Sequence, residues 1–189
     1  MKVNGNSLRP GYVIEHKSRL WVVVKTAHTQ PGKGGAYLQA ELKDIRDGTK
    51  LNERFRASED VERVRLETRD CQFLFTSDDV HTFMDQDTFD QFEIKDSVLG
   101  EDSIFLCDHM VVQINFYEEE VISVTLPDSI VLMVTEADPV VKGQTATSSF
   151  KPAVLENGVR IMVPPHIESG TRVVVNPHER TYVERAKNS

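Results

Sequence analysis

The sequence predicts an all-β protein made of three small barrels that follow one another along the chain. Short segments in which apolar and polar residues alternate recur over all 189 residues, and Gly, Asn, Asp and Pro turn residues separate them. Breaks in this pattern near residues 64–66 and 125–130 coincide with shifts in charge. Units of this length with several short strands each are typical of small β-barrels, not of one large sandwich. We predict domains at residues 1–64, 65–128 and 129–189.

The first unit contains two predicted β-hairpins. The segments "LWVVVK" (Leu20–Lys25) and "AYLQAELK" (Ala36–Lys43) are rich in strand-forming residues and flank a short polar stretch. Further on, Asp47-Gly48 separates "LKDIR" from "TKLNERF", which predicts a second hairpin closed by a two-residue turn.

The polar stretch of the first hairpin, "TQPGKGGA" (Thr29–Ala36), places one lysine among three glycines and a proline. Glycine permits tight turns and close approach by another molecule, and proline fixes the entry to the turn. The stretch is therefore predicted to be a loop that holds Lys33 at its tip. A plain flexible hairpin with an incidental lysine is the alternative interpretation, but so many glycines cost conformational entropy on ordering. A P-loop is excluded, because the G-x-x-x-x-G-K-[ST] frame is absent.

The later units show the same alternating pattern. Val112, Ile114 and Phe116 alternate with polar residues, as expected of a half-buried strand. A turn at Asn157-Gly158 precedes a similar segment in the last unit, where we expect further strands at Val159–Val163, Arg172–Asn176 and Thr181–Arg185. Only near the segment "DQDTFDQFEI" (residues 85–94) is the pattern compatible with a short helix.

Charge is distributed unevenly along the chain. Residues 1–64 carry 12 Lys and Arg against 8 Asp and Glu, whereas residues 65–128 carry 3 against 16. Residues 129–189 are nearly balanced, with 7 against 6. The net charge of -8 therefore hides two mildly basic ends, and contact with RNA phosphates through one end is compatible with the sequence.

The sequence lacks the signatures of an enzyme or a metal site. The segment that begins at Asp85 resembles the opening of an EF-hand, but Phe89 and Asp90 stand where a ligand and a glycine are needed. The six histidines are not paired at ligand spacing. Cys71 and Cys107 are interpreted as reduced thiols, although a single bridge between them stays open. Without an apolar spanning segment or a signal-peptide core, we expect a soluble cytoplasmic protein that does not bind membranes.

Several segments resemble bacterial translation elongation factor P. The tip loop Pro31–Ala36 resembles the loop at the end of the family's first domain. The similarity extends along essentially the whole chain, through "RFRASEDVE" (Arg54–Glu62), "FMDQDTFDQ" (Phe83–Gln91), the long segment Asp138–Gly170 and the ending "TYVERAK" (Thr181–Lys187).

The resemblance implies a KOW-like N-terminal barrel followed by two OB-fold barrels, in an L-shaped arrangement that imitates tRNA. It implies a monomeric, non-enzymatic factor without a cofactor that binds the 70S ribosome, through ribosomal RNA and proteins, between the P and E sites. Such a factor stimulates peptide-bond formation and relieves stalling at consecutive prolines by positioning the P-site tRNA.

Residue roles follow from the same resemblance. Lys33 occupies the position that reaches the acceptor end of the peptidyl-tRNA, and a separate lysine-modifying enzyme extends this lysine in many family members, for example by β-lysylation. Tyr182 and Arg185 match C-terminal ribosome contacts. The residues expected to shape the tip loop are Pro31, Gly32, Gly34 and Gly35. The residues expected near the E-site codon are Gly143, Gln144, Thr145 and Ala146, with Gln144 in place of the usual Asp.

Three alternatives compete with this interpretation. A stand-alone OB-fold protein that binds single-stranded nucleic acid would need basic grooves and stacking aromatics, whereas aromatics make up 7% of this chain and its middle is acidic. A paralogue of elongation factor P with other client sequences is disfavoured by the Pro-Gly-Lys-Gly loop. An enzyme would need an acid–base or metal constellation that the sequence does not show.

Overall fold

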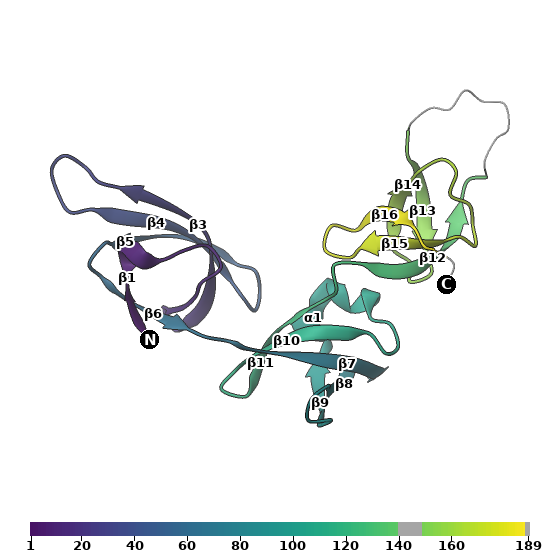
Figure 1. The fold of residues 1–189 in the computed structure, drawn as a ribbon, viewed down its shortest axis with the longest axis horizontal. Helices are drawn as coiled ribbons and strands as arrows, with labels where there is room; N and C mark the ends of the chain where they lie inside the picture. The colour runs from purple at the N-terminus through teal and green to yellow at the C-terminus, as the bar shows by residue number, and fades with distance from the viewer. Residues whose placement is uncertain (140–148, 188–189) are drawn as a thin grey trace. The chain divides into compact units, whose positions relative to one another are not determined.

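The computed structural model describes residues 1–139 and 149–187. In this part, sixteen strands form three antiparallel sheets, accompanied by one short α-helix and two 3-10 helices (Figure 1). The strand orders are β1-β6-β2-β3-β4-β5, then β11-β10-β7-β8-β9, then β14-β13-β12-β15-β16. The prediction of an all-β chain with three successive sheet units is confirmed.

The elements of the first sheet are β1 (Lys2–Asn4), the 3-10 helix η1 (Gly5–Ser7), β2 (Val13–His16), β3 (Arg19–Thr29), β4 (Tyr37–Asp44), β5 (Lys50–Arg56) and β6 (Asp60–Val64). Those of the second are β7 (Glu67–Ser77), β8 (Val80–Asp85), β9 (Gln91–Lys95), α1 (Asp96–Leu99), η2 (Gly100–Phe105), β10 (Val111–Tyr117) and β11 (Glu120–Thr125). Those of the third are β12 (Ile130–Ala137), β13 (Lys151–Leu155), β14 (Arg160–Val163), β15 (Arg172–Asn176) and β16 (Thr181–Arg185).

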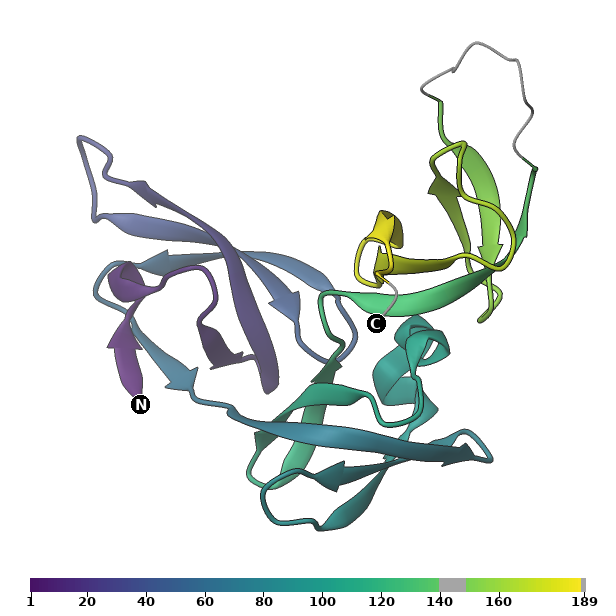
Figure 2. The same ribbon diagram turned by 45° about the vertical axis from the view of Figure 1, so that its right-hand side comes forward.

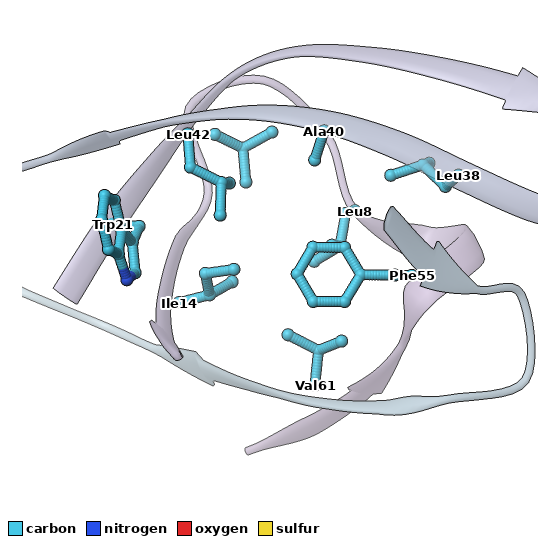
Figure 3. Close-up of a cluster of buried hydrophobic side chains, with 9 residues drawn as sticks. Leu8, Ile14, Trp21, Leu38, Ala40, Leu42, Phe55 and Val61 are labelled. Carbon is cyan, nitrogen blue, oxygen red and sulfur yellow. The ribbon is translucent and has the colours of Figure 1, made fainter. Parts of the chain in front are cut away.

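The first sheet curls around its own apolar core (Figure 3). Alternate residues of β4 point inward, so that Leu38, Ala40 and Leu42 are buried while the residues between them are not. Phe55 of β5 fills the centre of the cluster at 1% exposure, and Ile14 contributes from β2. Burying each of these larger side chains contributes roughly 1.5–3 kcal/mol. This core fixes which side of β3, β4 and β5 faces outward.

Strands β3 and β4 form the predicted hairpin (Figures 1 and 2). β3 extends beyond its other neighbour, β2, whereas β4 pairs with β5 along its whole length. Their pairing runs from Trp21↔Asp44 at the base to Thr29↔Tyr37 at the far end. A bulge between Val23 and Lys25 interrupts the register. Bulges increase local twist, and this one lies just beyond Val22, the last residue of β3 that pairs with β2.

The second hairpin, β4–β5, is present, but its predicted two-residue turn is wrong. β4 ends at Asp44 and β5 begins at Lys50, so the connection is longer. The buried carboxylate of Asp44 accepts backbone N–H bonds from Arg46 at 2.8 Å and Asp47 at 3.3 Å, which holds a wider turn. Gly48 adopts φ +75°, which explains the glycine after Asp47.

The short helix lies just after the segment 85–94 and not within it. Asp85 ends β8, and its carboxylate accepts N–H bonds from Asp87 at 2.8 Å and Thr88 at 3.1 Å. These hydrogen bonds stabilise a turn in place of a helix. Short acidic side chains often bind nearby backbone N–H groups in this way. Phe89 then adopts φ +63°, and β9 pairs with β8. The single α-helix among the described residues, α1, follows β9.

The expected strands of the later units are confirmed. Val112, Ile114 and Phe116 of β10 are buried at 1%, 0% and 6% exposure. In the last sheet, Gly158 adopts φ +86° in the turn between β13 and β14. β15 and β16 occupy the two segments expected to be strands.

The chain divides into two compact units, of which the first combines Met1–Arg69 with Ile114–Val124. Within this unit, Ile122 of β11 packs with Leu20 and Val64 of the first sheet. The other described residues form the second unit. Among the residues that the structure describes, no helix combines the length and apolar character needed to cross a membrane.

Candidate functional site

The candidate site is the tip loop, residues 30–36, which joins the end of β3 to the start of β4. Residues 30–35 are all exposed, with Lys33 in the middle of the loop. At its base, the Ala57 amide donates a hydrogen bond to the Ala36 carbonyl at 3.0 Å, which ties the loop to the segment after β5. The loop is therefore anchored at one end and open at the other.

The three loop glycines differ in what the backbone requires. Gly34 has φ +115°, a conformation that L-residues rarely adopt. Gly32 and Gly35 have no such φ, and a Cβ added at any of the three would meet nothing within 4 Å. Only Gly34 is thus demanded by the loop's own conformation. At Gly32 and Gly35, the missing side chains leave room for another molecule to approach the backbone.

The Lys33 ammonium group has no hydrogen bond or ion pair with any residue in the described part of the chain. A primary amine held in this way carries its positive charge without local compensation. It is suited to contact an anionic group, and an enzyme could reach it for covalent modification. Lys33 therefore lies exposed in the glycine-rich loop between β3 and β4, where the sequence predicted it.

Two contacts that the sequence did not reveal support the hairpin below the loop. The Arg54 guanidinium lies over the Tyr37 ring, 3.4 Å from its centroid. On the other strand, His28 Nδ1 lies 2.9 Å from Asn6 Oδ1, which links β3 to η1. Gly5 allows η1 to pack here, because a Cβ would lie 2.4 Å from the Arg56 carbonyl oxygen. The β4–β5 register, which the sequence pattern does not give, pairs Arg54 with Gln39 and so places it diagonally across from Tyr37.

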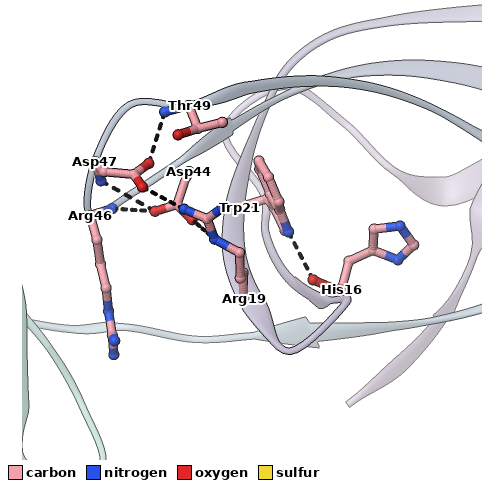
Figure 4. A network of polar contacts seen from close by, with 7 residues as sticks. All are labelled: His16, Arg19, Trp21, Asp44, Arg46, Asp47 and Thr49. Carbon is pink, nitrogen blue, oxygen red and sulfur yellow. Dashed lines mark hydrogen bonds and ion pairs between the residues drawn. The ribbon is translucent and has the colours of Figure 1, made fainter.

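A polar network holds the base of the same hairpin (Figure 4). Asp44, at 3% exposure, forms an ion pair with Arg19 Nε at 2.6 Å, and Arg19 also reaches Asp47 at 2.5 Å. Asp47 in turn accepts the Thr49 N–H at 2.9 Å. Beside it, Trp21 Nε1 donates to the His16 carbonyl at 2.8 Å. This network satisfies the buried carboxylate of Asp44 and fixes the angle at which β4 turns into β5.

A second cluster lies at the turn between β2 and β3. Glu53 Oε2 lies 2.8 Å from Lys17 Nζ and 2.9 Å from His16 Nε2. The hydrogen bond from Lys17, followed by that from His16, lowers the pKa of Glu53 from 4.5 to about 2. Glu53 is thus an ionised anion whose charge is compensated locally.

The predicted C-terminal positions, Tyr182 and Arg185, both lie on β16. Their pairing partners on β15 are Val175 and Val173, which share one face of the sheet. A bulge in the register between these pairs brings the two side chains, three residues apart, to the same face. The Phe150 ring meets the Tyr182 ring edge-on, with centroids 6.4 Å apart. The predicted codon loop, Gly143–Ala146, lies outside the described residues.

Neither a metal site nor a disulfide accompanies these features. In residues 1–139 and 149–187, no three His, Cys, Asp or Glu side chains are grouped to hold a metal ion. Cys71 is buried and Cys107 is half-buried, and neither forms a disulfide. Burial raises the pKa of the Cys107 thiol.

The sequence is similar to curated proteins over nearly its entire length. It is 58% identical over 186 residues to elongation factor P from Brucella canis, Brucella suis biovar 1 and Brucella abortus, covering 98% of this chain and 100% of each relative. The chain belongs to the bacterial elongation factor P family. The resemblance found in the sequence is therefore confirmed.

Family models assign each sheet unit to this family. The elongation factor P KOW-like domain matches residues 4–61, the OB domain matches residues 66–124, and the C-terminal domain matches residues 130–185. The KOW-like type predicted for the first barrel and the OB type predicted for the second are confirmed by these matches.

Solved structures of two translation factors share the fold. Eukaryotic translation initiation factor 5A from Methanococcus jannaschii matches with a TM-score of 0.57 and 22% identity, covering 67% of this chain and 94% of its own. A translation initiation factor of the same family from Naegleria fowleri matches with a TM-score of 0.55 and 14% identity, covering 67% and 98%. At these identities, the likeness concerns the fold alone.

Proposed function

We propose that this protein is a translation elongation factor that binds the 70S ribosome between the P and E sites and relieves stalling at consecutive prolines. Its membership of the elongation factor P family supports the general role. The observation that carries the finer proposal is the exposed, uncompensated Lys33 at the end of a long hairpin, with open glycine positions beside it. A cytoplasmic monomer is the form in which we propose that it acts.

The proposed mechanism is positioning of the P-site tRNA. Proline is a poor participant in peptide-bond formation, because its ring restricts the geometry of attack. A cation next to the phosphates of the acceptor end would hold the peptidyl-tRNA in a reactive pose while the ribosome performs the chemistry. Each 1.36 kcal/mol of barrier removed in this way raises the rate about tenfold. The protein itself needs no catalytic group for this role.

We further propose that Lys33 is a substrate of a lysine-modifying enzyme that adds a β-lysyl or similar group. Its full exposure and the bare glycines beside it support access by such an enzyme. The added group would extend the reach of the cation. Intact mass of the protein from its native source is the measurement, and an unmodified mass would contradict this step.

In the C-terminal domain, we propose that Tyr182 and Arg185 contact the small subunit, with the loop Gly143–Ala146 near the E-site codon. The exposure of Arg185 and the half-buried position of Tyr182 on the same strand support such a contact. Gln144 would supply hydrogen bonds without the charge of the usual Asp.

The experiment is reconstituted translation of a message that encodes Pro-Pro-Pro, with protein purified from its native source. We expect faster synthesis on this message and no change on a proline-free message. Lys33→Ala should abolish the stimulation, whereas Lys2→Ala, which removes another lysine of the same barrel, should retain it. Full activity of Lys33→Ala would exclude the tip-lysine role, and no stimulation by the modified wild-type protein would exclude the proline function.

A further inference from the structure

The short 3-10 helix η1 packs against β4 and β5, on the hairpin that carries the tip loop and the strand beside it. Gly5 makes this close packing possible, because a Cβ there would lie 2.4 Å from the Arg56 carbonyl oxygen and 3.0 Å from Phe55 Cβ. The Gly5 amide also donates a hydrogen bond to the Glu59 carbonyl at 2.8 Å. Main-chain contacts therefore fix η1 against the end of β5 and the turn that follows it.

Asn6 of η1 is connected to both strands of the hairpin. Its main-chain amide donates to the Ala57 carbonyl at 3.2 Å, and the Ala57 amide donates to the Ala36 carbonyl at 3.0 Å. Ala36 is the last residue of the tip loop, directly before β4. The side chain of Asn6 reaches the other strand, because its Oδ1 lies 2.9 Å from His28 Nδ1 of β3. Asn6 thus reaches the β4 side through main-chain bonds and β3 through its side chain.

The register of the hairpin explains why His28 can meet η1. His28 pairs with Leu38, whose side chain is fully buried in the core. Because paired residues of antiparallel strands share one face of the sheet, His28 lies on the inner face of the hairpin. An amide oxygen can only accept a hydrogen bond, so His28 Nδ1 carries the proton and donates it to Asn6. This bond holds β3 two residues before the tip loop begins at Gln30.

We propose that Asn6 is a positioning residue for Lys33. This inference rests on the proposed function of the tip loop. Because the Lys33 ammonium is not paired with any described residue, its direction depends on the strands that carry the loop. The glycines on either side of Lys33 add little stiffness of their own. Fixing both strands at the base narrows the directions that the loop can take, and so increases the fraction of bound molecules in which Lys33 meets the acceptor end.

The test variants change only the side-chain bond of this arrangement. Asn6→Leu removes the acceptor at similar size and keeps the main-chain amide that bonds to Ala57. Asn6→Asp keeps an acceptor oxygen at the same position and is the conservative variant, whereas His28→Ala removes the donor. Asn4→Leu is the matched control, because Asn4 is an exposed asparagine directly before η1 whose side chain does not cap this helix. Thermal unfolding of each full-length variant checks that the barrel is intact.

The first measurement is the order of the loop in the free protein, from NMR relaxation of the amides of residues 32–35. We expect lower order parameters in Asn6→Leu and in His28→Ala, and wild-type values in Asn6→Asp and Asn4→Leu. Combining Asn6→Leu with His28→Ala should loosen the loop no further than either change alone, because both remove the same bond. Unchanged loop order in Asn6→Leu would overturn the proposal.

The second measurement is Pro-Pro-Pro synthesis over a range of factor concentrations, with intact mass confirming that each protein carries Lys33 in the same state. We expect Asn6→Leu to lower the maximal rate about threefold, as the loss of one exposed hydrogen bond would. The concentration for half-maximal stimulation should stay unchanged, because the bond orients the loop and does not contact the ribosome. Asn6→Asp should restore the rate. An equal loss in Asn4→Leu, or a change in the half-maximal concentration alone, would overturn the positioning role.

Loop order separates this proposal from the proposed function, because it is measured without ribosomes. A wild-type protein that does not stimulate Pro-Pro-Pro synthesis, together with a looser loop in Asn6→Leu, would refute the proposed function and support the role of Asn6 in orienting Lys33. Stimulation by the wild type, together with unchanged loop order in Asn6→Leu, would refute the role of Asn6 and leave the proposed function intact.

Discussion

Gly34 differs from its neighbours in the tip loop because its φ of +115° is unfavourable for any residue with a side chain. We expect Gly34→Ala to lower the free energy of unfolding by about 1 kcal/mol. Gly35→Ala should change it by less than about 0.5 kcal/mol, because its φ is compatible and its Cβ would meet open space. Thermal unfolding of the two variants makes the comparison. Equal losses would show that the loop relaxes around Gly34.

The variants Gly34→Ala and Gly35→Ala also distinguish effects on stability from effects on proline rescue. If Gly35 is bare so that RNA or an enzyme can approach, Gly35→Ala should reduce proline rescue while leaving stability unchanged. Rescue at the wild-type level would show that the space beside Gly35 is not used.

Glu53 makes the first barrel sensitive to acid. Its pKa is about 2 in the folded protein, against 4.5 for the unperturbed group. Because the folded pKa is the lower one, the stabilisation is present above pH 4.5 and is lost as pH falls toward 2. The group is partly exposed, so we expect about 1 kcal/mol. Urea unfolding between pH 6 and 3 should show a steeper loss for the wild type than for Glu53→Gln, and parallel curves would contradict this.

At the residue scale, the sequence predicted Lys33 but not Arg54. Lys33 stands among glycines and a proline, and these residue types restrict the backbone locally. Arg54 is one of several arginines, and its significance depends on lying over Tyr37, which is 17 positions away in the sequence. Contacts of this kind follow from strand register, which alternation alone leaves open.

The β4–β5 turn depends on a single buried carboxylate. Asp44 accepts two backbone N–H bonds and pairs with Arg19. Asp44→Ala leaves these donors unsatisfied, so we expect a loss of about 2–4 kcal/mol in the free energy of unfolding. Asp47→Ala is the control, because the Asp47 side chain is 53% exposed and its loss should destabilise the fold much less than the loss of Asp44. Chemical denaturation of both variants tests the difference, and similar losses would show that the network acts without Asp44.

Elements were predictable where a local pattern determines them. The β3–β4 hairpin and the β10 strand follow from periodicity, and both are confirmed. The short helix begins only after residues 85–94, because the Asp85 carboxylate accepts hydrogen bonds from the following amides and starts a turn. The β4–β5 turn failed for a similar reason at Asp44. In both cases, a side-chain acceptor competed with the backbone pattern that the sequence suggested.

At the scale of the whole molecule, three sheet units and their family were predictable, because turn signals and motifs recur along the chain. The association of residues 114–124 with the first sheet was not predictable. It depends on packing between segments far apart in the sequence, such as Ile122 with Leu20 and Val64. The predicted boundary at residue 64 stays a prediction, and this packing provides a way to test it.

Ile122 is 2% exposed and packs against the first sheet, although it lies far from residues 1–64 in the sequence. Its truncation should therefore affect the first barrel. We expect Ile122→Ala to cost about 2–4 kcal/mol, because a buried cavity forms between β11 and the first sheet. Hydrogen exchange should accordingly become faster in β2, β3 and β6. Val121→Ala, in the neighbouring half-buried position, should have a smaller effect. If the first barrel folds independently of the residues after 64, its amides should exchange equally slowly in Ile122→Ala and in the wild type. Faster exchange of these amides in the variant would mean that β11 belongs to the same folding unit as the first barrel.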